Sequence, residues 1–562
     1  TRGKQSDDFR IRMICRKPLA QRDKMHILAK LARASQTRQR GTHAMMIALF
    51  RILAVTLAVM ASLPARAEWY EASSDHFVIY ADDKEADIRT FAENLERYHS
   101  AMAFVLKAKI EKPSPSNRVV IYVVGGQRDM RSLTGGSKTI AGFYVPRAGG
   151  SRAFVQDIRN TKGYPDFSTI VLLHEYAHHF LISSSSFAQP RWLSEGSAEF
   201  FAAAGFNSDG SLLIGRPAQH RGGELVFADP VHVRELLDPA LYEKQRGKGY
   251  DAFYGKSWLL YHYLTFSEER RGQLGKYLVN LYNNMAPLAA GEDAFGDIDA
   301  LERELAAYLR SRRMMTFVLT PDKLSTGSTI TLRKLPHGEA EIVPVMIRSQ
   351  RGVNEEQAAE LLVEARAIAA KFPEDAGVLA ALAEAEYDAG NDAEAIAAAN
   401  NAIARDPSRT NAYVQKGYAL FRQAQEADDK NAAYVAAMQP FEALNKIEND
   451  HPLPLIYYYR SYVERGAEPN ENARAALERA SKLAPFDQGL QLNAGMMLID
   501  ERKHGIARTF LGPVAANPHG GGAAAQAKLL LTLIKDVPDG EKVDIRNLHE
   551  LVETPEVTAS GD

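Results

Sequence analysis

Five prolines recur through the last third of the chain, at Pro373, Pro407, Pro452, Pro485 and Pro518. They are separated by 34, 45, 33 and 33 residues, and the segments between them are rich in alanine. A sequence with a period of about 34 residues builds one helical unit many times, and each unit buries its apolar face against the next. We therefore expect residues 354–536 to form an all-α repeat domain, with an insertion near residues 423–433 where the interval is longest.

The segment from Leu379 to Pro407 resembles the tetratricopeptide (TPR) repeat. Gly390 would form the turn between two helices, and Ala383 and Ala395 would let those helices pack closely. The resemblance implies a surface that binds a peptide or protein partner, and a structural stack without a ligand is the alternative. The polar tail, residues 537–562, is expected to be disordered.

The first 67 residues differ in charge from the remainder. They carry 14 Lys and Arg against 3 Asp and Glu, so the rest of the chain, at −2 − 11 = −13, is acidic. This balance excludes the basic footprint of a nucleic-acid-binding protein. The 562 residues also exceed what one hydrophobic core supports, which predicts two or three domains.

The same leader has the order of a secretory signal. Met45 or Met46 is followed by Arg51, an apolar run over residues 52–63 and the small residues around Ala67. We expect cleavage before Glu68 and export to the periplasm of a Gram-negative cell. The mature form would then have no stable membrane span. An uncleaved anchor is the alternative. Residues 1–44 would then precede the true start. The single cysteine, Cys15, lies in this leader, so the mature chain has neither disulfides nor thiolate ligands.

Residues 68–315 mix strand-like and helix-like patterns. Short runs rich in branched and aromatic residues predict strands, and longer amphipathic runs predict helices. An α+β domain is expected here, followed by a β-rich connector over residues 316–353. The predicted strands are residues 76–82, 118–124, 140–145 and 152–156.

The motif His174-Glu175-Tyr176-Ala177-His178 lies in an apolar run over residues 168–182 that we expect to be a helix. Residues four apart lie one turn apart on one helix face, so His174 and His178 could bind one Zn²⁺ through nitrogen. Glu175 could then reach a water at the metal. The alternative is a pair of hydrogen-bonded histidines in a buried helix.

A third acidic ligand follows in the segment RWLSEGSAEFF, where Glu195 comes 17 positions after His178, on a second helix that we expect Pro190 to open. These two helices resemble the gluzincin metallopeptidases, and among them the peptidase-MA-like families, in which TPR repeats can follow the peptidase domain. The resemblance spans residues 69–314 and implies a zincin-like fold with His174, His178 and Glu195 on zinc. Leu181 and Ser184 stand where a metzincin needs glycine and histidine.

Further residues are candidates around the metal. Glu199, one turn after Glu195, would accept a hydrogen bond from a ligating histidine, or it would be a solvated glutamate. A donor to the carbonyl oxygen is also needed. Tyr254 is the preferred residue, Tyr250 the second and His262 the third, and core packing is the alternative for Tyr254.

The predicted hairpin, residues 140–145 and 152–156, could bind an extended peptide along an exposed strand edge, provided that this edge lies beside the zinc helix. The sequence therefore predicts an α+β zincin-like metallopeptidase domain followed by an all-α TPR-like repeat domain. The predicted function is that of an exported zinc-dependent peptidase that acts on peptides or proteins. The alternative is a non-catalytic TPR scaffold of the cell envelope with an inactive peptidase-like domain.

Overall fold

The computed structural model of the chain describes residues 68–544, except 110, 139, 159–162, 186, 246–248 and 518. The leader with its signal peptide, residues 1–67, and residues 545–562 of the tail lie outside the described residues. All described residues belong to one compact unit. Within this part of the chain, no helix has both the length and the apolar character that a membrane span requires.

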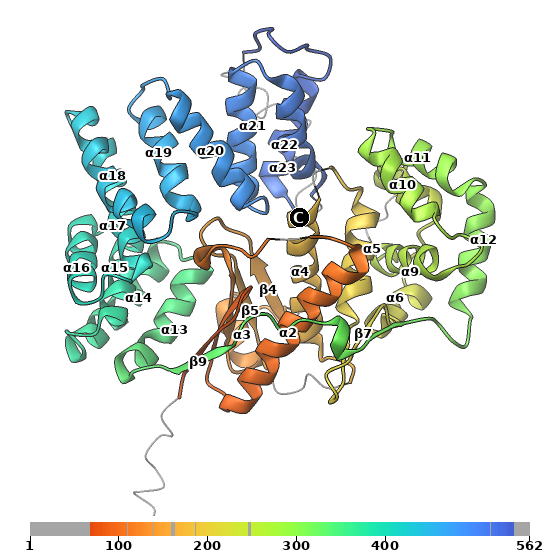
Figure 1. Cartoon of the computed structure of the whole chain (residues 1–562), viewed down its shortest axis with the longest axis horizontal. Helices are drawn as coiled ribbons and strands as arrows, with labels where there is room; N and C mark the ends of the chain where they lie inside the picture. The colour runs from red at the N-terminus through yellow and green to blue at the C-terminus, as the bar shows by residue number, and fades with distance from the viewer. Residues whose placement is uncertain are drawn as a thin grey trace, which may run out of the picture. The chain divides into compact units, whose positions relative to one another are not determined.

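A six-stranded mixed sheet forms the centre of the N-terminal region (Figure 1). Its strand order is β4-β5-β3-β2-β1-β9, in which β2, β3 and β5 run parallel and the other neighbours pair antiparallel. β4 and β9 are therefore the edge strands. The strands are β1 (Tyr70–Ser73), β2 (Phe77–Ala81), β3 (Val119–Val123), β4 (Gly142–Val145), β5 (Arg152–Val155) and β9 (Thr331–Lys334).

Alternate residues of the strands face opposite sides of this sheet, and both sides are covered. Ile121 packs in the core that includes α2 (Glu85–Leu106) and α4 (Phe167–Ser184). Tyr122, its neighbour in β3, packs in a second cluster with residues of α3 (Gln127–Leu133) and α13 (His337–Arg351). This burial on both faces explains why the central strands are continuous apolar runs.

The predicted β-rich connector over residues 316–353 is only partly a strand region. β8 (Phe317–Leu319) extends a small sheet of β6 (Gly205–Phe206) and β7 (Leu212–Ile214), and β9 extends the large sheet, so both strands belong to the α+β region. The remainder contains a short 3₁₀-helix (Pro321–Lys323), connecting segments and the helix α13, which contains Pro344. The prediction was wrong there because the branched residues of this run are buried by tertiary packing, which overrides local preference.

Helices follow α4 to complete the α+β region. α5 (Arg191–Ala202) packs against both α4 and α9 (Phe253–Phe266). Pro190 stands immediately before α5 instead of inside its first turn. The other helices are α6 (Gly222–Phe227), α7 (Val233–Leu237), α8 (Pro239–Gln245), α10 (Gln273–Tyr282), α11 (Pro287–Phe295) and α12 (Ile298–Leu309).

The C-terminal region is a series of helix pairs (Figure 1), and each helix packs on the next. The longest proline interval adds no separate helix: seven of its 11 extra residues lengthen α17 to 16 residues and α18 to 18, against 13 and 14 in the preceding pair, and the others lengthen the connections. The helices are α14 (Glu355–Lys371), α15 (Ala376–Asp388), α16 (Asp392–Arg405), α17 (Thr410–Gln425), α18 (Lys430–Ile447), α19 (Pro452–Glu464), α20 (Glu471–Leu483), α21 (Gln488–Asp500), α22 (His504–Ala516) and α23 (Gly521–Leu533).

The start of the predicted polar tail packs on these helices. The backbone N–H of Gly540 donates to the carbonyl of Arg502, and the carbonyl of Glu541 accepts a hydrogen bond from His504 at 2.8 Å. The expectation of disorder is therefore wrong for residues 537–544, because hydrogen bonds fix them to the start of α22.

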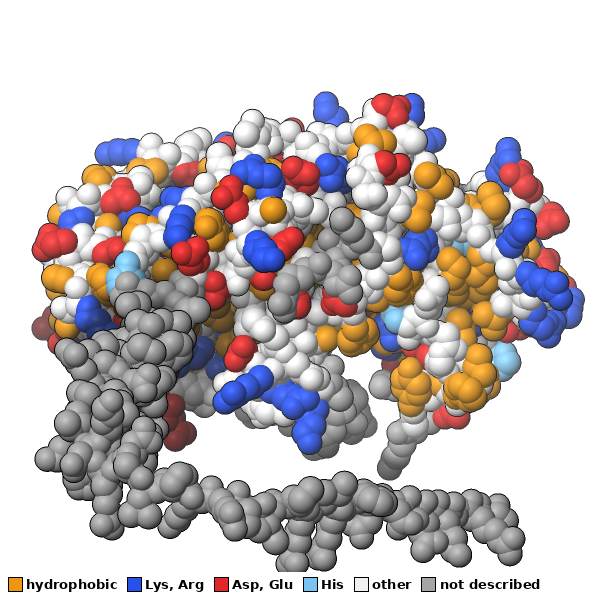
Figure 2. Space-filling model, turned by 90° about the horizontal axis from the view of Figure 1, so that it is seen from below, with side chains coloured by type: hydrophobic (Ala, Val, Ile, Leu, Met, Phe, Trp, Pro, Cys, Tyr) orange, Lys and Arg blue, Asp and Glu red, His pale blue; other side chains and the backbone are white. Residues whose placement is uncertain are grey.

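The turn between β4 and β5 contacts the repeats. The backbone N–H of Ala148 donates to Asp487 at 2.8 Å, and a side chain at Gly149 would approach Leu453. Nearby, the Asn117 amide donates to the carbonyl of Leu483 at 3.1 Å. These contacts hold the last repeats against the α+β region. On the face drawn in Figure 2, acidic and basic side chains of the described residues are interspersed.

Candidate metal centre

Two helices carry the predicted ligands and fix their positions. α4 begins at an N-cap, where the Asp166 carboxylate accepts from the backbone N–H of Thr169 at 3.1 Å. α5 crosses α9 so closely that a Cβ at Gly196 would overlap the backbone of Ser257. Because Gly196 follows Glu195 directly, this close crossing sets the position of the carboxylate.

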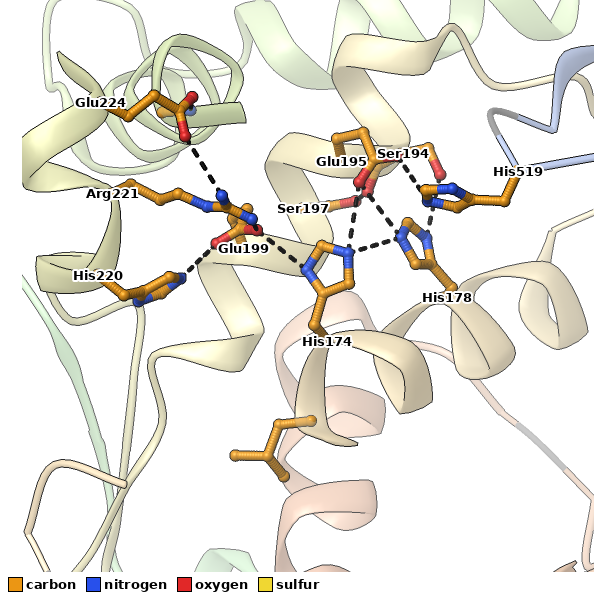
Figure 3. Close-up of polar contacts among 12 residues, drawn as sticks. His174, His178, Ser194, Glu195, Ser197, Glu199, His220, Arg221, Glu224 and His519 are labelled. Atoms are coloured by element: carbon orange, nitrogen blue, oxygen red, sulfur yellow. Dashed lines mark hydrogen bonds and ion pairs between the residues drawn. The ribbon is translucent and has the colours of Figure 1, made fainter. Parts of the chain in front are cut away.

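The three predicted ligands lie together (Figure 3). The Nε2 atoms of His174 and His178 are 3.0 Å apart, and each is 3.4 Å from Oε2 of Glu195. Donor atoms that share a tetrahedral zinc ion at 2.0–2.1 Å are separated by about 3.3 Å. The three atoms are thus spaced as zinc coordination requires.

The carboxylate of this cluster is buried and faces histidine rings. Glu195 is 0% exposed, and its carboxylate oxygens lie 3.1–3.4 Å from imidazole nitrogens, which carry no charge when they ligate a metal. A buried carboxylate in this state is costly unless a cation neutralises it. Burial lowers the pKa of His174, but the Glu199 and Glu195 carboxylates outweigh burial and raise that pKa to about 10. The residues therefore fit a bound cation.

Glu199 contacts the ring nitrogen of His174 that points away from the candidate metal position. Its Oε1 atom lies 3.1 Å from Nδ1 of His174, and Oε2 lies 2.6 Å from Nε2 of His220. Glu199 is 1% exposed, which excludes the solvated alternative. Burial would raise the pKa of Glu199, but His174 and its other partners lower it well below its ordinary value. A carboxylate in this place fixes the tautomer and the orientation of the ring.

Three residues that contact the cluster or Glu199 were not predicted from the sequence. Arg221 pairs with both Glu199 and Glu224, and His220 is its neighbour in the chain (Figure 3). Ser194 Oγ lies 3.2 Å from Nδ1 of His178. Ser194 could have been found, since it stands one residue before Glu195. His220 and Arg221 lie in a short 3₁₀-helix (Gln219–Arg221) whose sequence has no feature that points to α4 or α5.

A fourth unpredicted residue comes from the repeats. Nε2 of His519, in the loop between α22 and α23, is 3.1 Å from Oε1 of Glu195. Its ring also meets that of His178, with centroids 5.8 Å apart. Figure 3 shows His519 directed at these two residues. More than three hundred positions separate His519 from Glu195, so only the fold brings the two together.

The candidates for the carbonyl donor differ in their surroundings. Tyr254 is half-buried, and its ring lies under the Arg221 guanidinium at 4.7 Å. Burial raises the pKa of Tyr254, and the Glu195 carboxylate adds to the increase. Tyr250 is 69% exposed, with its hydroxyl 3.5 Å from Glu224.

His262, the third candidate, is a core residue. Its Nε2 atom is 2.9 Å from the carbonyl of Gly215, and its Nδ1 atom is 2.8 Å from the hydroxyl of Tyr308. Both ring nitrogens therefore form hydrogen bonds within the core. His262 was an incorrect candidate for this reason, since neither nitrogen is left to donate to a carbonyl oxygen.

One of the two predicted hairpin strands lies where peptide binding requires it, at a sheet edge beside α4. β4 is an edge strand that packs against α4, whereas β5 is internal. Tyr144 of β4 has its hydroxyl 2.6 Å from Nδ1 of His179, which follows the candidate ligand His178 in the chain. His179 faces this tyrosine and is not one of the three clustered ligands.

Comparisons with known proteins concern the helical repeats. No family model matches the chain, and no curated protein matches it. Similar solved structures are TPR proteins. TTC0263, a thermophilic TPR protein of Thermus thermophilus, is 14% identical, covers 35% of this chain and 100% of its own, and has a TM-score of 0.30.

Two other solved structures show weaker similarity. MamA is 14% identical over 33% of this chain and 96% of its own, with a TM-score of 0.25. Yeast Tom70 is 13% identical over 58% of this chain and 69% of its own, with a TM-score of 0.25. Because these TM-scores are low, we assign the helical repeat from the helix pairs of this chain and not from the similar structures.

Proposed function

We propose that this chain is an exported zinc-dependent peptidase of the gluzincin type. The observation that carries the proposal is the buried cluster of His174, His178 and Glu195, whose three ligand atoms lie within 4.8 Å of one another. Imidazole nitrogens with one carboxylate oxygen are a donor set typical of catalytic zinc. Export, with the periplasm as destination, rests on the sequence pattern of residues 1–67.

When bound, zinc would polarise a carbonyl group and lower the pKa of water. Glu175 follows His174 on α4 and lines a cavity together with His178. Its carboxylate would take a proton from the attacking water and pass it to the leaving amine. The Tyr254 hydroxyl would donate a hydrogen bond to the carbonyl oxygen as negative charge develops there.

The substrate would be a peptide in extended conformation. β4 is an edge strand of the described sheet beside α4, and main-chain hydrogen bonds to such an edge bind a peptide with little dependence on its sequence. Tyr144, on this strand, lines the same cavity as Glu175. A peptide along β4 would therefore pass the base.

A non-catalytic scaffold is the second candidate. The helix pairs from α14 to α23 are the part of the molecule that favours it, because repeats of this kind present surfaces for protein partners. Under this alternative, zinc would be structural and Glu175 would have no role.

Glu175→Gln separates the two functions. The substitution removes the base but leaves the ligands, so we expect one zinc per chain and a loss of hydrolysis of about 100-fold or more. Zinc would be measured by mass spectrometry, and hydrolysis by digestion of a peptide library. Glu360→Gln, on the exposed side of α14, is the matched control. A wild-type protein that binds zinc and cleaves no peptide would favour the scaffold.

A further inference from the structure

A cavity of about 240 Å³ lies between the metal helix α4 and the last repeats. Glu175 and His178 line it at the metal side, and Ile182 continues the same wall. The facing wall belongs to the repeats and is formed by residues of α21, α22 and the adjoining loops. Its residues include Phe486, Pro513, Ala516 and His519.

Tertiary contacts fix the repeat wall in place. The ring of Phe486 packs on His179, with centroids 4.4 Å apart. Ile182, at the end of α4, packs against the core of the last repeats, and the turn residue Ala148 is buried in that core. The contacts that hold the repeats on the sheet therefore also place this wall opposite Glu175.

The size and lining of the cavity indicate what it would hold. Drug-sized ligands occupy pockets of about 300–1,000 Å³, whereas an apolar cavity of about 150 Å³ accepts benzene. At about 240 Å³, this cavity suits one large apolar side chain. Leu181, Phe486 and Ala516 give it the apolar surface for that purpose.

His519 supplies the polar end of the wall. It contacts Oε1 of Glu195, whereas the ligand histidines face Oε2. Its side chain is 51% exposed, so it can still reach a bound molecule. With Nε2–H directed at Glu195, Nδ1 of the neutral ring can accept a hydrogen bond from a backbone N–H of a peptide.

We propose that the last repeats form one wall of the substrate site, that their cavity binds a large apolar side chain beside the scissile bond, and that His519 contacts the peptide backbone there. This inference rests on the proposed peptidase function. It gives the repeats a role in specificity within their own chain.

The first test fills the cavity from the repeat wall. The probes are peptide hydroxamates that differ only in one side chain, from glycine to leucine and phenylalanine, and their binding to the zinc-loaded Glu175→Gln protein is measured by calorimetry. We expect the leucine and phenylalanine probes to bind about 10-fold or more tightly than the glycine probe. Ala516→Trp should abolish this preference.

Ala525→Trp, at an exposed position of α23, is the control and should keep the preference. Ala516→Leu fills less of the cavity and should reduce the preference for large apolar side chains. It serves as the test if Ala516→Trp does not fold. A preference that persists in both Ala516 variants, or that the wild type lacks while it binds zinc and cleaves peptides, overturns this inference. Absence of zinc from the wild type would instead remove the proposed function.

The second test concerns His519. His519→Ala should keep one zinc per chain and weaken all probes by a similar factor of about 10, because a backbone contact is independent of the side chain bound. His519→Gln, whose amide keeps both a donor and an acceptor, should recover part of the affinity. Loss of zinc in His519→Ala would make the residue a metal ligand and would contradict its assignment to the substrate wall.

Discussion

Nε2 of His519 lies 3.1 Å from Oε1 of Glu195, and this contact joins the helical repeats to the α+β region at the candidate metal centre. Glu195 belongs to α5 of the α+β region, and His519 follows the last complete helix pair of the repeats. The repeats therefore reach the buried carboxylate on which the proposed chemistry depends. The repeats contribute a residue to the site.

Glu199→Gln should lower the affinity for zinc by about 10- to 100-fold. The substitution removes the negative charge that orients His174 and leaves Arg221 without its partner at this end. Zinc dissociation constants measured by competition with a chromophoric chelator check this expectation, with Glu360→Gln as the control. An unchanged affinity would show that the carboxylate has no part in holding the ligand.

Tyr254→Phe should lower kcat by about 100-fold and leave KM nearly unchanged, because the hydroxyl would act mainly as charge develops on the substrate. Tyr250→Phe is the matched control, since that side chain is largely exposed. Steady-state kinetics on one cleaved peptide make the comparison. If Tyr250→Phe gave the larger decrease, the assignment of the donor would move to Tyr250.

Gly196→Ala should destabilise the protein by about 1–3 kcal/mol, since the added methyl group overlaps the backbone of Ser257 at the crossing of α5 and α9. Gly275→Ala is the control. It lies at an exposed position of α10 with open space around it, and should stabilise the protein by about 0.5–1 kcal/mol. Urea unfolding measures both. A neutral Gly196→Ala would contradict the close crossing that positions Glu195.

Acid should destabilise the fold between pH 6.5 and about 4 through buried histidines. Burial lowers the pKa of His262 to about 4, so as the pH falls the unfolded chain takes up a proton before the folded chain does. His451 has its pKa lowered to about 4 by burial and acts with the same sign.

The contribution of His262 alone between pH 7 and 5 is about 2 kcal/mol. His262→Asn should therefore lose less stability than the wild type over this range. Urea unfolding of the metal-free proteins at both pH values provides the comparison, and His337→Asn, a partly exposed histidine, is the control. Equal losses in His262→Asn and the wild type would show that His262 is not buried as a neutral ring.

Local sequence was sufficient to predict the two helices that carry the candidate ligands. His174 and His178 lie four residues apart on one helix, and Glu195 lies on the next, so their meeting depends on one helix pair. The periodic prolines likewise predicted the helix pairs, because each pair is a local unit. These features follow from spacing within about 35 residues.

The features that escaped prediction depend on distant contacts. His519 reaches Glu195 through the packing of whole repeats on the sheet, which no local pattern encodes. The helix α13 was predicted as strand because Val343, Val345 and Ile347 favour strands by their branching. Their burial against the sheet and the neighbouring helices decides the outcome.

Zinc content is the most direct test of the account. Mass spectrometry of the purified protein should find one zinc per chain, and His174→Ala and Glu195→Ala should each remove it, whereas His337→Ala, far from the cluster in sequence, should retain it. This result would establish a three-residue metal centre in solution. A wild-type protein without zinc, or variants that both retain it, would contradict the central claim.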